Sequence, residues 1–186
     1  MYKINDKIED FRAMAYQDDD FKEIKFSDYD GKWRIIVFYP ADFTFVCPTE
    51  LGEMADNYET FKKEGAELFS VSCDTEFTHM AWHDASDTIK KIKFPMLADP
   101  TGKLAKAFGV YMEDAGLALR GSFVIDPEGV LKTIEIHEPS VGRSCKELLR
   151  KLRAAKFAAE HGQVCPASWE PGDEALTPGK ELVGKI

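Results

Sequence analysis

The sequence predicts an α/β fold in which helices flank a central mixed sheet. Short segments rich in β-branched and aromatic residues alternate with segments of helical character, which is typical of a sheet covered by helices. A hydrophobic fraction of 44% beside 31% charged residues fits a globular protein. The 186 residues suit a single domain. We predict this domain over 1–162, followed over 163–186 by an extended tail rich in glycine and proline.

The first half of the chain predicts alternating strands and helices. Segments 8–16 and 21–26 are short strands or loop pieces, joined to the next element by a turn at 28–32. Trp33–Tyr39 is an apolar run that predicts a buried strand. The elements expected after it are a helix over 48–63 ended by Gly65, a strand over 67–73, a helix over 76–86 capped by Asp74 and Thr75, a strand over 92–98 broken by Pro95, and a short helix over 103–108.

The second half of the chain predicts a hairpin and a long helix. Strands over 120–126 and 130–137 are joined by the turn Pro127-Glu128-Gly129. An amphipathic helix follows over 145–161. The alternation implies a mostly parallel sheet with helices on both faces, and the closing hairpin adds an antiparallel edge. The result is a mixed sheet of the thioredoxin-like kind.

Charge and hydropathy narrow the class of function. The net charge of −9 argues against nucleic-acid binding, which needs clustered lysine and arginine. The sequence has no apolar run of the length that a membrane span needs, and its first residues lack the apolar core of a signal peptide. We therefore expect a cytoplasmic protein with no membrane partner.

The cysteine pattern points to one reactive thiol rather than to a disulfide scaffold. Four cysteines are too sparse for such a scaffold, and no C-x-x-C pair indicates zinc or a dithiol. Cys47 lies just after the predicted strand and before Pro48, which suits the first turn of a helix. Free backbone amides and the helix dipole stabilise a thiolate there. Thr44 lies three residues earlier, where its hydroxyl could bind a substrate oxygen and the sulfur.

Two motifs together resemble a known family. The segment Pro40-Ala41-Asp42-Phe43-Thr44-Phe45-Val46-Cys47-Pro48-Thr49-Glu50 resembles the active-site loop of peroxiredoxins of the typical two-cysteine class. Val164-Cys165-Pro166-Ala167 resembles the resolving-cysteine segment of the same family. The ending Leu182-Val183-Gly184-Lys185-Ile186 resembles its bacterial alkyl hydroperoxide reductase branch. The resemblance implies a thiol peroxidase that reduces hydrogen peroxide and organic hydroperoxides.

The resemblance also implies residue roles around Cys47. Cys47 attacks the peroxide and becomes a sulfenic acid, while Thr44 and Arg120 stabilise the breaking O–O bond and Pro40 shields the thiolate. Arg120 opens an apolar strand, where a solvent-exposed strand end is its other interpretation.

The remaining roles implied by the resemblance lie farther from the thiol. Glu50 and Arg143 orient Arg120, although Glu50 also suits an ordinary first helical turn. Cys165 resolves the sulfenic acid of the partner subunit.

The resemblance further implies partners but no cofactor. Electrons come from a reductant protein, either a flavoprotein resembling the F component of alkyl hydroperoxide reductase or thioredoxin. The working form is an obligate homodimer, assembled into a ring of five dimers through a segment that includes Phe77 and Thr78. Because the loop over 114–118 and the tail lack the motifs of sensitive members, we expect resistance to overoxidation.

Other interpretations stay open. A redox-dependent chaperone or a peroxide-signalling relay is the alternative to the enzyme, and a cysteine hydrolase would need a base beside Cys47. Cys73 and Cys145 are expected to be structural. His79 and His83 have metal-ligand spacing, but without a third ligand we expect them on an ordinary helix face and predict no metal site.

Overall fold

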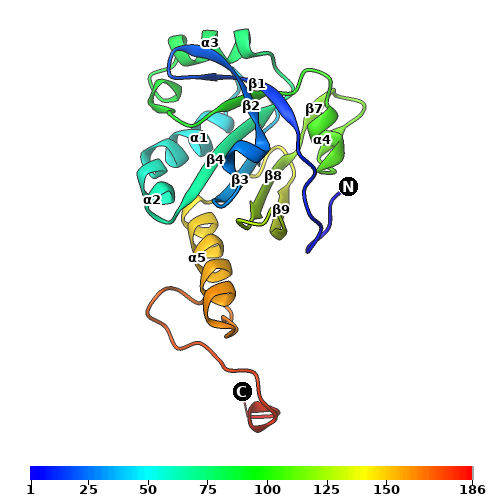
Figure 1. Cartoon of the computed structure of the whole chain (residues 1–186). Coiled ribbons are helices and arrows are strands. Elements are labelled where there is room, and N and C mark those ends of the chain that lie inside the picture. Colours follow the sequence, from blue (N-terminus) through cyan, green and yellow to red (C-terminus); the bar gives the residue numbers. More distant parts are fainter. Residues whose placement is uncertain (186) are drawn as a thin grey trace. The chain divides into compact units, whose positions relative to one another are not determined.

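The computed structural model describes residues 1–185 and shows two compact units, 1–145 and 146–186. Ile186, which ends the C-terminal motif, lies outside the described residues. The first unit contains a seven-stranded sheet in the order β2-β1-β5-β4-β3-β8-β9 and a separate two-stranded sheet, β6-β7 (Figure 1). No helix among residues 1–185 is long and apolar enough to cross a bilayer.

The elements follow the predicted alternation closely. The strands are β1 Arg12–Gln17, β2 Asp20–Lys25, β3 Trp33–Phe38, β4 Ala66–Ser72, β5 Met96–Ala98, β6 Tyr111–Met112, β7 Leu117–Ala118, β8 Arg120–Ile125 and β9 Leu131–His137. The helices are α1 Cys47–Asp56, α2 Tyr58–Lys63, α3 Glu76–Ala85, α4 Lys103–Ala107 and α5 Cys145–His161, with 3-10 turns η1 Phe26–Tyr29, η2 Ile89–Lys91 and η3 Lys180–Leu182.

Strand β3 lies inside the sheet and is buried along its whole length. Its side chains alternate between the two faces, as in any strand. Ile36 and Phe38 belong to one apolar cluster with Leu104 and Phe108, which pack from the α4 segment. The ring centroids of Phe38 and Phe108 are 5.2 Å apart. Burial of this kind holds β3 fixed, so the loop that follows it starts from a rigid point.

The sheet is mixed, as predicted, but it is less parallel than the alternation implied. Strand β3 pairs in parallel with β4, and β4 pairs in parallel with β5. Every other pairing in the seven-stranded sheet is antiparallel, including β3 with β8. The hairpin β8–β9 therefore enters the sheet beside β3 itself. The prediction missed this because a hairpin pattern in the sequence does not say which strand it joins.

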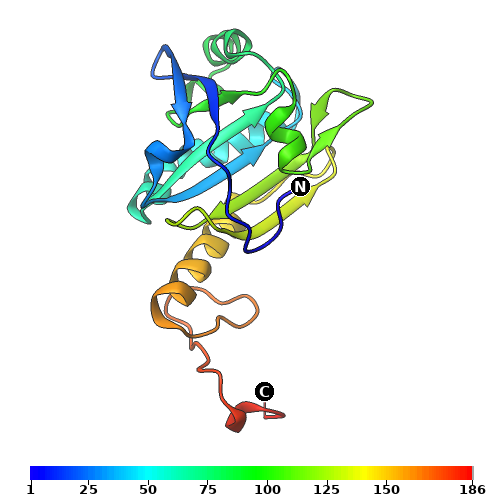
Figure 2. The same ribbon diagram turned by 45° about the vertical axis from the view of Figure 1, so that its right-hand side comes forward.

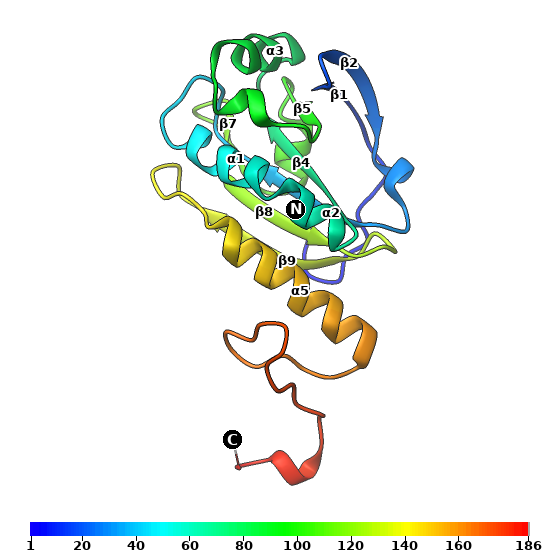
Figure 3. The same ribbon diagram turned by 90° about the vertical axis from the view of Figure 1, so that its left-hand side faces the viewer.

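The predicted helix over 48–63 is wrong in one respect, because the structure divides it into α1 and α2. The break is at Asn57, whose backbone leaves helical geometry at φ −104° and ψ 4°. Its side-chain Nδ2 donates to the carbonyl of Glu53 at 2.8 Å. Asparagine side chains that bind nearby backbone groups disfavour a continuous helix. The two helices follow one another on the same face of the sheet (Figure 3).

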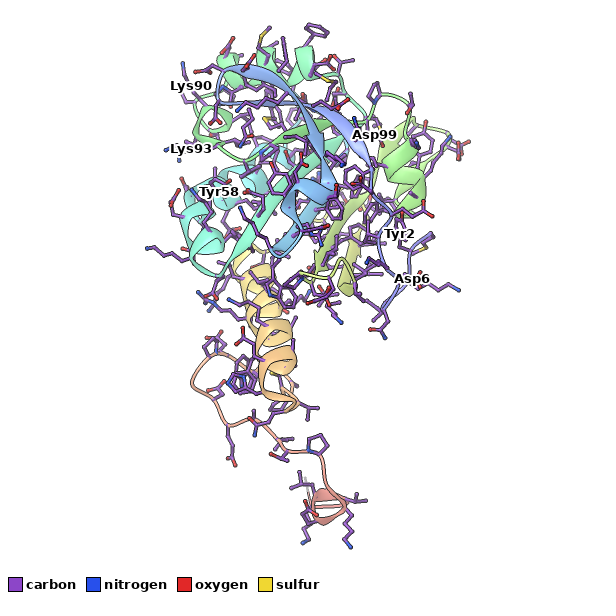
Figure 4. All side chains as sticks on the ribbon, viewed as in Figure 1. Tyr2, Asp6, Tyr58, Lys90, Lys93 and Asp99 are labelled. Carbon is purple, nitrogen blue, oxygen red and sulfur yellow. The ribbon has the colours of Figure 1, made fainter. Side chains whose placement is uncertain are left out.

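The segment around β5 also differs from expectation. The predicted strand over 92–98 begins only at Met96, after Pro95, because proline has no N–H for the ladder. Asp99, labelled in Figure 4, then starts α4: its carboxylate accepts the amides of Leu104 at 3.1 Å and Ala105 at 2.8 Å. The β6–β7 hairpin beside α4 was not predicted (Figure 2).

In the second unit, the tail packs on the part of α5 that belongs to the same unit. Trp169 is buried, and its ring centroid lies 4.7 Å from that of Phe157 on α5. The Trp169 carbonyl accepts Nη1 of Arg150 at 3.2 Å. Val164 and Leu176 form a backbone bridge in which the amide of each residue donates to the carbonyl of the other. The tail therefore has an ordered packing of its own around Trp169.

Candidate active site

Cys47 is the first residue of α1, at the end of the loop that follows β3. Its side chain is 0% exposed. Pro48 occupies the first turn, as the sequence predicted, and no side chain caps the helix at Val46. The free amides and the dipole of this turn therefore favour a negative charge at the sulfur. This is the environment in which a cysteine reacts as a thiolate.

Arg120 is the side chain that contacts the sulfur. It is the first residue of β8, and antiparallel pairing of β8 with β3 places it beside the end of β3. Its Nη1 lies 3.4 Å from Cys47 Sγ, and its Nε donates to the Pro139 carbonyl at 2.7 Å. Arg120 is 3% exposed, so the alternative of a solvent-exposed strand end is wrong. A buried guanidinium at this distance stabilises a thiolate.

Glu50, one turn after Cys47, joins Arg120 to Arg143. Its Oε2 accepts Nη1 of Arg120 at 2.6 Å. Its Oε1 accepts the backbone amide of Arg143 at 2.7 Å and the side-chain Nε at 2.9 Å. Burial alone raises the pKa of Glu50, but the hydrogen bonds and charge of Arg143, with the charge of Arg120, hold that pKa below its ordinary value. Glu50 is thus a buried carboxylate rather than an ordinary exposed first-turn residue.

Arg143 is fixed from the strand side as well. Its Nη1 donates to the Gly121 carbonyl at 2.8 Å and to the Ser122 hydroxyl at 3.2 Å, both on β8. The cluster of Cys47, Glu50, Arg120 and Arg143 therefore ties the first turn of α1 to β8. Because Arg120 and Arg143 are both anchored by fixed partners, the guanidinium beside the sulfur is held in one orientation.

A pocket of about 390 Å³ lies against this cluster. Pro40, Thr44 and Arg120 line it, together with Phe45, Val46, Glu138, Pro139 and Ser140. The hydroxyl of Thr44 donates to the Ala41 carbonyl at 2.8 Å, so its proton is not directed at the sulfur as the sequence suggested. Its oxygen remains able to accept a hydrogen bond from a molecule in the pocket.

A second polar cluster lies beneath the loop, and sequence reasoning missed it. Asp42 is buried, and its carboxylate accepts the Tyr39 hydroxyl at 2.7 Å. The other oxygen lies 2.7 Å from Nδ1 of His79, whose Nε2 lies 3.1 Å from the Leu97 carbonyl. The backbone amide of Asp42 donates to Asp74 at 2.9 Å. These contacts fix the loop between Pro40 and Cys47 to α3 and to the sheet.

The cluster corrects the interpretation of His79. We expected this residue on an ordinary helix face, but it is 0% exposed. The signal in the sequence was its position within α3, one turn after the cap Thr75 and near Trp82, on the side of the helix that faces the sheet. Residues 1–185 contain no group of three or more potential metal ligands.

The other histidines contact backbone carbonyls. His83 Nε2 lies 3.4 Å from the Ile92 carbonyl, and His137 Nδ1 lies 3.2 Å from that of Val141. His161 Nδ1 lies 3.0 Å from the Phe157 carbonyl. With His79 bound to Asp42, each of the four histidines is engaged elsewhere. The arrangement therefore does not favour a cysteine hydrolase, which needs a base beside the sulfur.

The remaining cysteines differ from Cys47 in their surroundings. Burial raises the pKa of Cys73 to about 11 and that of Cys145 to about 12, with nearby carboxylates adding to both shifts. Both environments suit structural thiols. Cys165 is partly buried, its Sγ lies 3.6 Å from the Ala154 carbonyl, and burial raises its pKa. All four cysteines are free thiols in this structure.

The two residues predicted at an oligomer interface lie at the start of α3. Phe77 is 60% exposed, and its ring centroid is 5.0 Å from that of Phe21 on β2. The Thr78 amide donates to the Thr75 hydroxyl, which caps the helix. Phe77 thus offers an exposed aromatic surface, while Thr78 stabilises the helix start.

Two family models match most of the chain. The model of the AhpC/TSA family matches residues 4–134, and that of the C-terminal domain of 1-Cys peroxiredoxin matches residues 154–183. Alkyl hydroperoxide reductase C of Salmonella typhimurium and of Escherichia coli are each 50% identical to this chain, with both chains covered completely.

Solved structures agree with the sequence comparison. A crystal structure of Enterococcus faecalis AhpC is 51% identical with a TM-score of 0.86, covering 89% of this chain and 100% of that one. The reduced 2-Cys peroxiredoxin of Plasmodium vivax is 32% identical with a TM-score of 0.91, covering 96% of this chain and 94% of its own. The thioredoxin-like peroxiredoxin fold is therefore confirmed, and the chain belongs to the AhpC/TSA family.

Proposed function

We propose that this chain is a thiol peroxidase that reduces hydrogen peroxide and organic hydroperoxides with Cys47 as the nucleophile. The observation that carries the proposal is the Arg120 Nη1 atom 3.4 Å from Cys47 Sγ, in the buried first turn of a helix. Relatives named alkyl hydroperoxide reductase C, at 50% identity over the whole chain, support it. The geometry of the Cys47 site and the similarity to these relatives thus favour an enzyme over a chaperone or a signalling relay.

The reaction begins with the Cys47 thiolate. The sulfur attacks the terminal oxygen of the peroxide, an S–O bond forms and the O–O bond breaks. The leaving oxygen takes the electron pair and then a proton, and departs as water or an alcohol. Cys47 is oxidised to a sulfenic acid while the peroxide is reduced. During this step negative charge moves from the sulfur to the departing oxygen. The Arg120 guanidinium contacts the sulfur and also lines the pocket that holds the peroxide, so it stabilises the charge on both atoms.

Thr44 and Pro40 complete the pocket. The Thr44 oxygen accepts a hydrogen bond from the O–H group of the hydroperoxide and so orients its terminal oxygen toward the sulfur. Pro40 is buried and excludes water from the thiolate side of the pocket. Glu50 and Arg143 act as positioning residues, because they hold Arg120 rather than meeting the peroxide.

Cys165 is proposed to resolve the sulfenic acid of the partner subunit. Its thiol condenses with the sulfenic acid, an S–S bond forms, and water leaves. A reductant protein then supplies two electrons and two protons to restore both thiols. Two kinds of reductant suit this step, a flavoprotein resembling the F component of alkyl hydroperoxide reductase or thioredoxin. No bound cofactor is needed on this chain.

The proposed assembly is a homodimer, joined into a ring of five dimers through the α3 surface that carries Phe77 and Thr78. The exposed ring of Phe77 beside Phe21 supports this placement. We place the protein in the cytoplasm, because a reducing compartment keeps its four cysteines as thiols until a peroxide arrives.

Non-reducing electrophoresis after one equivalent of hydrogen peroxide tests the proposal. The wild-type chain is expected to form a disulfide-linked dimer, and Cys47→Ser and Cys165→Ser are each expected to abolish it. Cys73→Ser is the matched control and should leave the dimer unchanged. A disulfide dimer that persists in Cys165→Ser would contradict the resolving role, and peroxide consumption that survives Cys47→Ser would contradict the proposed nucleophile.

A further inference from the structure

The pocket beside Cys47 has one wall whose side chains the mechanism does not use. This wall is the turn after β9, which contributes Glu138, Pro139 and Ser140. Phe45 and Val46 of the cysteine loop also line the pocket, and Phe45 is 93% exposed. The surface that these residues present to the pocket is mainly apolar. The two charged groups that line the pocket are Arg120 at its inner end and Glu138 at its exposed rim.

The Glu138 carboxylate is held in place by its own turn. The Ser140 amide donates to Glu138 Oε2 at 3.0 Å, and the Ser140 hydroxyl donates to the same oxygen. The Val141 amide donates to the Glu138 carbonyl at 3.0 Å. These Ser140 hydrogen bonds, with a contribution from Arg120, lower the pKa of Glu138, so this carboxylate is ionised at neutral pH. The rim thus carries a fixed negative charge.

The charges deeper in the pocket balance one another. Arg120 and Arg143 supply two positive charges, and Glu50 and the Cys47 thiolate supply two negative ones. The reactive cluster is consequently neutral when it is ready to react. An anionic substrate gains no net attraction there, and it meets Glu138 on entry. The net charge of −9 on the whole chain adds repulsion in the same sense.

We propose that Glu138 is a specificity residue that favours uncharged hydroperoxides over anionic ones at the Cys47 site. The inference rests on the proposed peroxidase function and names the substrate class of that same site. Hydrogen peroxide and neutral alkyl hydroperoxides enter without repulsion, and the alkyl group lies against Phe45, Val46 and Pro139. Hydroperoxides that carry a carboxylate pass the rim less readily.

A matched pair of substrates tests this selection. The pair is a hydroperoxide of a short carboxylic acid and its methyl ester, with hydrogen peroxide as a reference that carries no charge. The rate constant for Cys47 oxidation is measured for each in a rapid-mixing instrument. The ester-to-acid rate ratio is expected to fall about two- to five-fold in Glu138→Gln, the range for one exposed charge. In the wild type, high salt (about 1 M) should lower the ratio as well, because the screening length is then about 3 Å.

Two control variants separate this effect from net charge and from folding. Glu128→Gln removes one charge in the turn at the other end of the β8–β9 hairpin and should leave the ratio unchanged. Glu138→Asp keeps the charge and should retain most of the discrimination. An unchanged ratio in Glu138→Gln, with normal hydrogen peroxide reactivity, would overturn the inference alone. Failure of the wild type to react with hydrogen peroxide would overturn the proposed function itself.

Discussion

Arg120 donates through one nitrogen, Nη1, both to Cys47 Sγ at 3.4 Å and to Glu50 Oε2 at 2.6 Å. The same guanidinium donates through Nε to the Pro139 carbonyl. Its orientation toward the sulfur is therefore set by two partners that do not react. Substitutions that keep a positive charge but lose this geometry separate the contribution of charge from that of position.

Arg120→Lys is such a substitution. Lysine keeps the charge but has a single nitrogen in place of the three nitrogens of the guanidinium. It therefore cannot reach Cys47, Glu50 and Pro139 together. We expect the rate constant for Cys47 oxidation by hydrogen peroxide to fall about 10²-fold, as for the loss of one preorganised donor. Stopped-flow measurement at several peroxide concentrations checks this. A rate within about two-fold of the wild type would mean that charge alone is sufficient.

Glu50→Gln tests the positioning role of the carboxylate. The variant removes the buried carboxylate that pairs with both Arg120 and Arg143. We expect the free energy of unfolding to fall by about 3 kcal/mol, since breaking a buried pair is costly. The peroxide rate should fall as well, because Arg120 loses one of its two anchors.

The matched control for Glu50→Gln is Asp56→Asn at the end of the same helix. Asp56 pairs with Lys91 at 3.1 Å on the exposed surface, where such a pair contributes about 0–1 kcal/mol. Urea unfolding of both variants checks the difference. Equal stability losses in the two variants would contradict the buried role of Glu50.

The pKa of Glu50 also predicts how stability depends on pH. Its folded-state pKa lies below the ordinary value of 4.5, so the ionised carboxylate stabilises the folded chain. This stabilisation is complete above the ordinary value and is lost as the pH falls through the folded-state pKa. Urea unfolding between about pH 7 and pH 3 should therefore show an acid loss that is smaller in Glu50→Gln. Parallel pH profiles for the two proteins would be inconsistent with a lowered pKa.

Cys73 and Cys145 are expected to resist alkylation in the folded protein. With a pKa of about 11 for Cys73 and about 12 for Cys145, few of these thiols are ionised at about pH 8. For Cys73 the thiolate fraction is roughly 10⁻³, and only the thiolate reacts. The Cys47→Ser/Cys165→Ser variant should take up iodoacetamide slowly when folded and at both remaining cysteines when unfolded. Mass spectrometry checks the count, and fast labelling of the folded variant would argue against structural thiols.

Asp42→Asn tests the cluster beneath the cysteine loop. The carboxylate accepts from Tyr39 and His79, so the substitution replaces one acceptor oxygen by a donor. We expect a loss of about 1–3 kcal/mol in the free energy of unfolding. The peroxide rate should fall about tenfold, because the loop that carries Thr44 is less fixed. Asp84→Asn, an exposed residue of α3, serves as control and should change neither quantity.

The sequence predicted those parts of the site that depend on local patterns. The strand Trp33–Tyr39 and the proline after Cys47 were sufficient to place the thiol at a helix start, because both signals act within a few residues. Arg120 stands out for a similar reason, as a charge that opens an apolar strand. The structure adds that it is buried and contacts the sulfur.

What the sequence did not predict depends on contacts between distant segments. The contact of His79 with Asp42 joins residues that are 37 positions apart, and no local sequence pattern predicts it. The pairing of β8 with β3 is of the same kind. The break at Asn57 is local, but it depends on a side chain that competes with the helix backbone.

The turn that carries Glu138 has a consequence for how this enzyme could be altered. Its carboxylate is held by Ser140, two residues away, so the charge at the rim is supported within a single short turn. The reactive groups come from α1 and β8 and do not depend on that carboxylate for their own hydrogen bonds. Substrate preference and reactivity are thus physically separable, and each could change by substitution without the other.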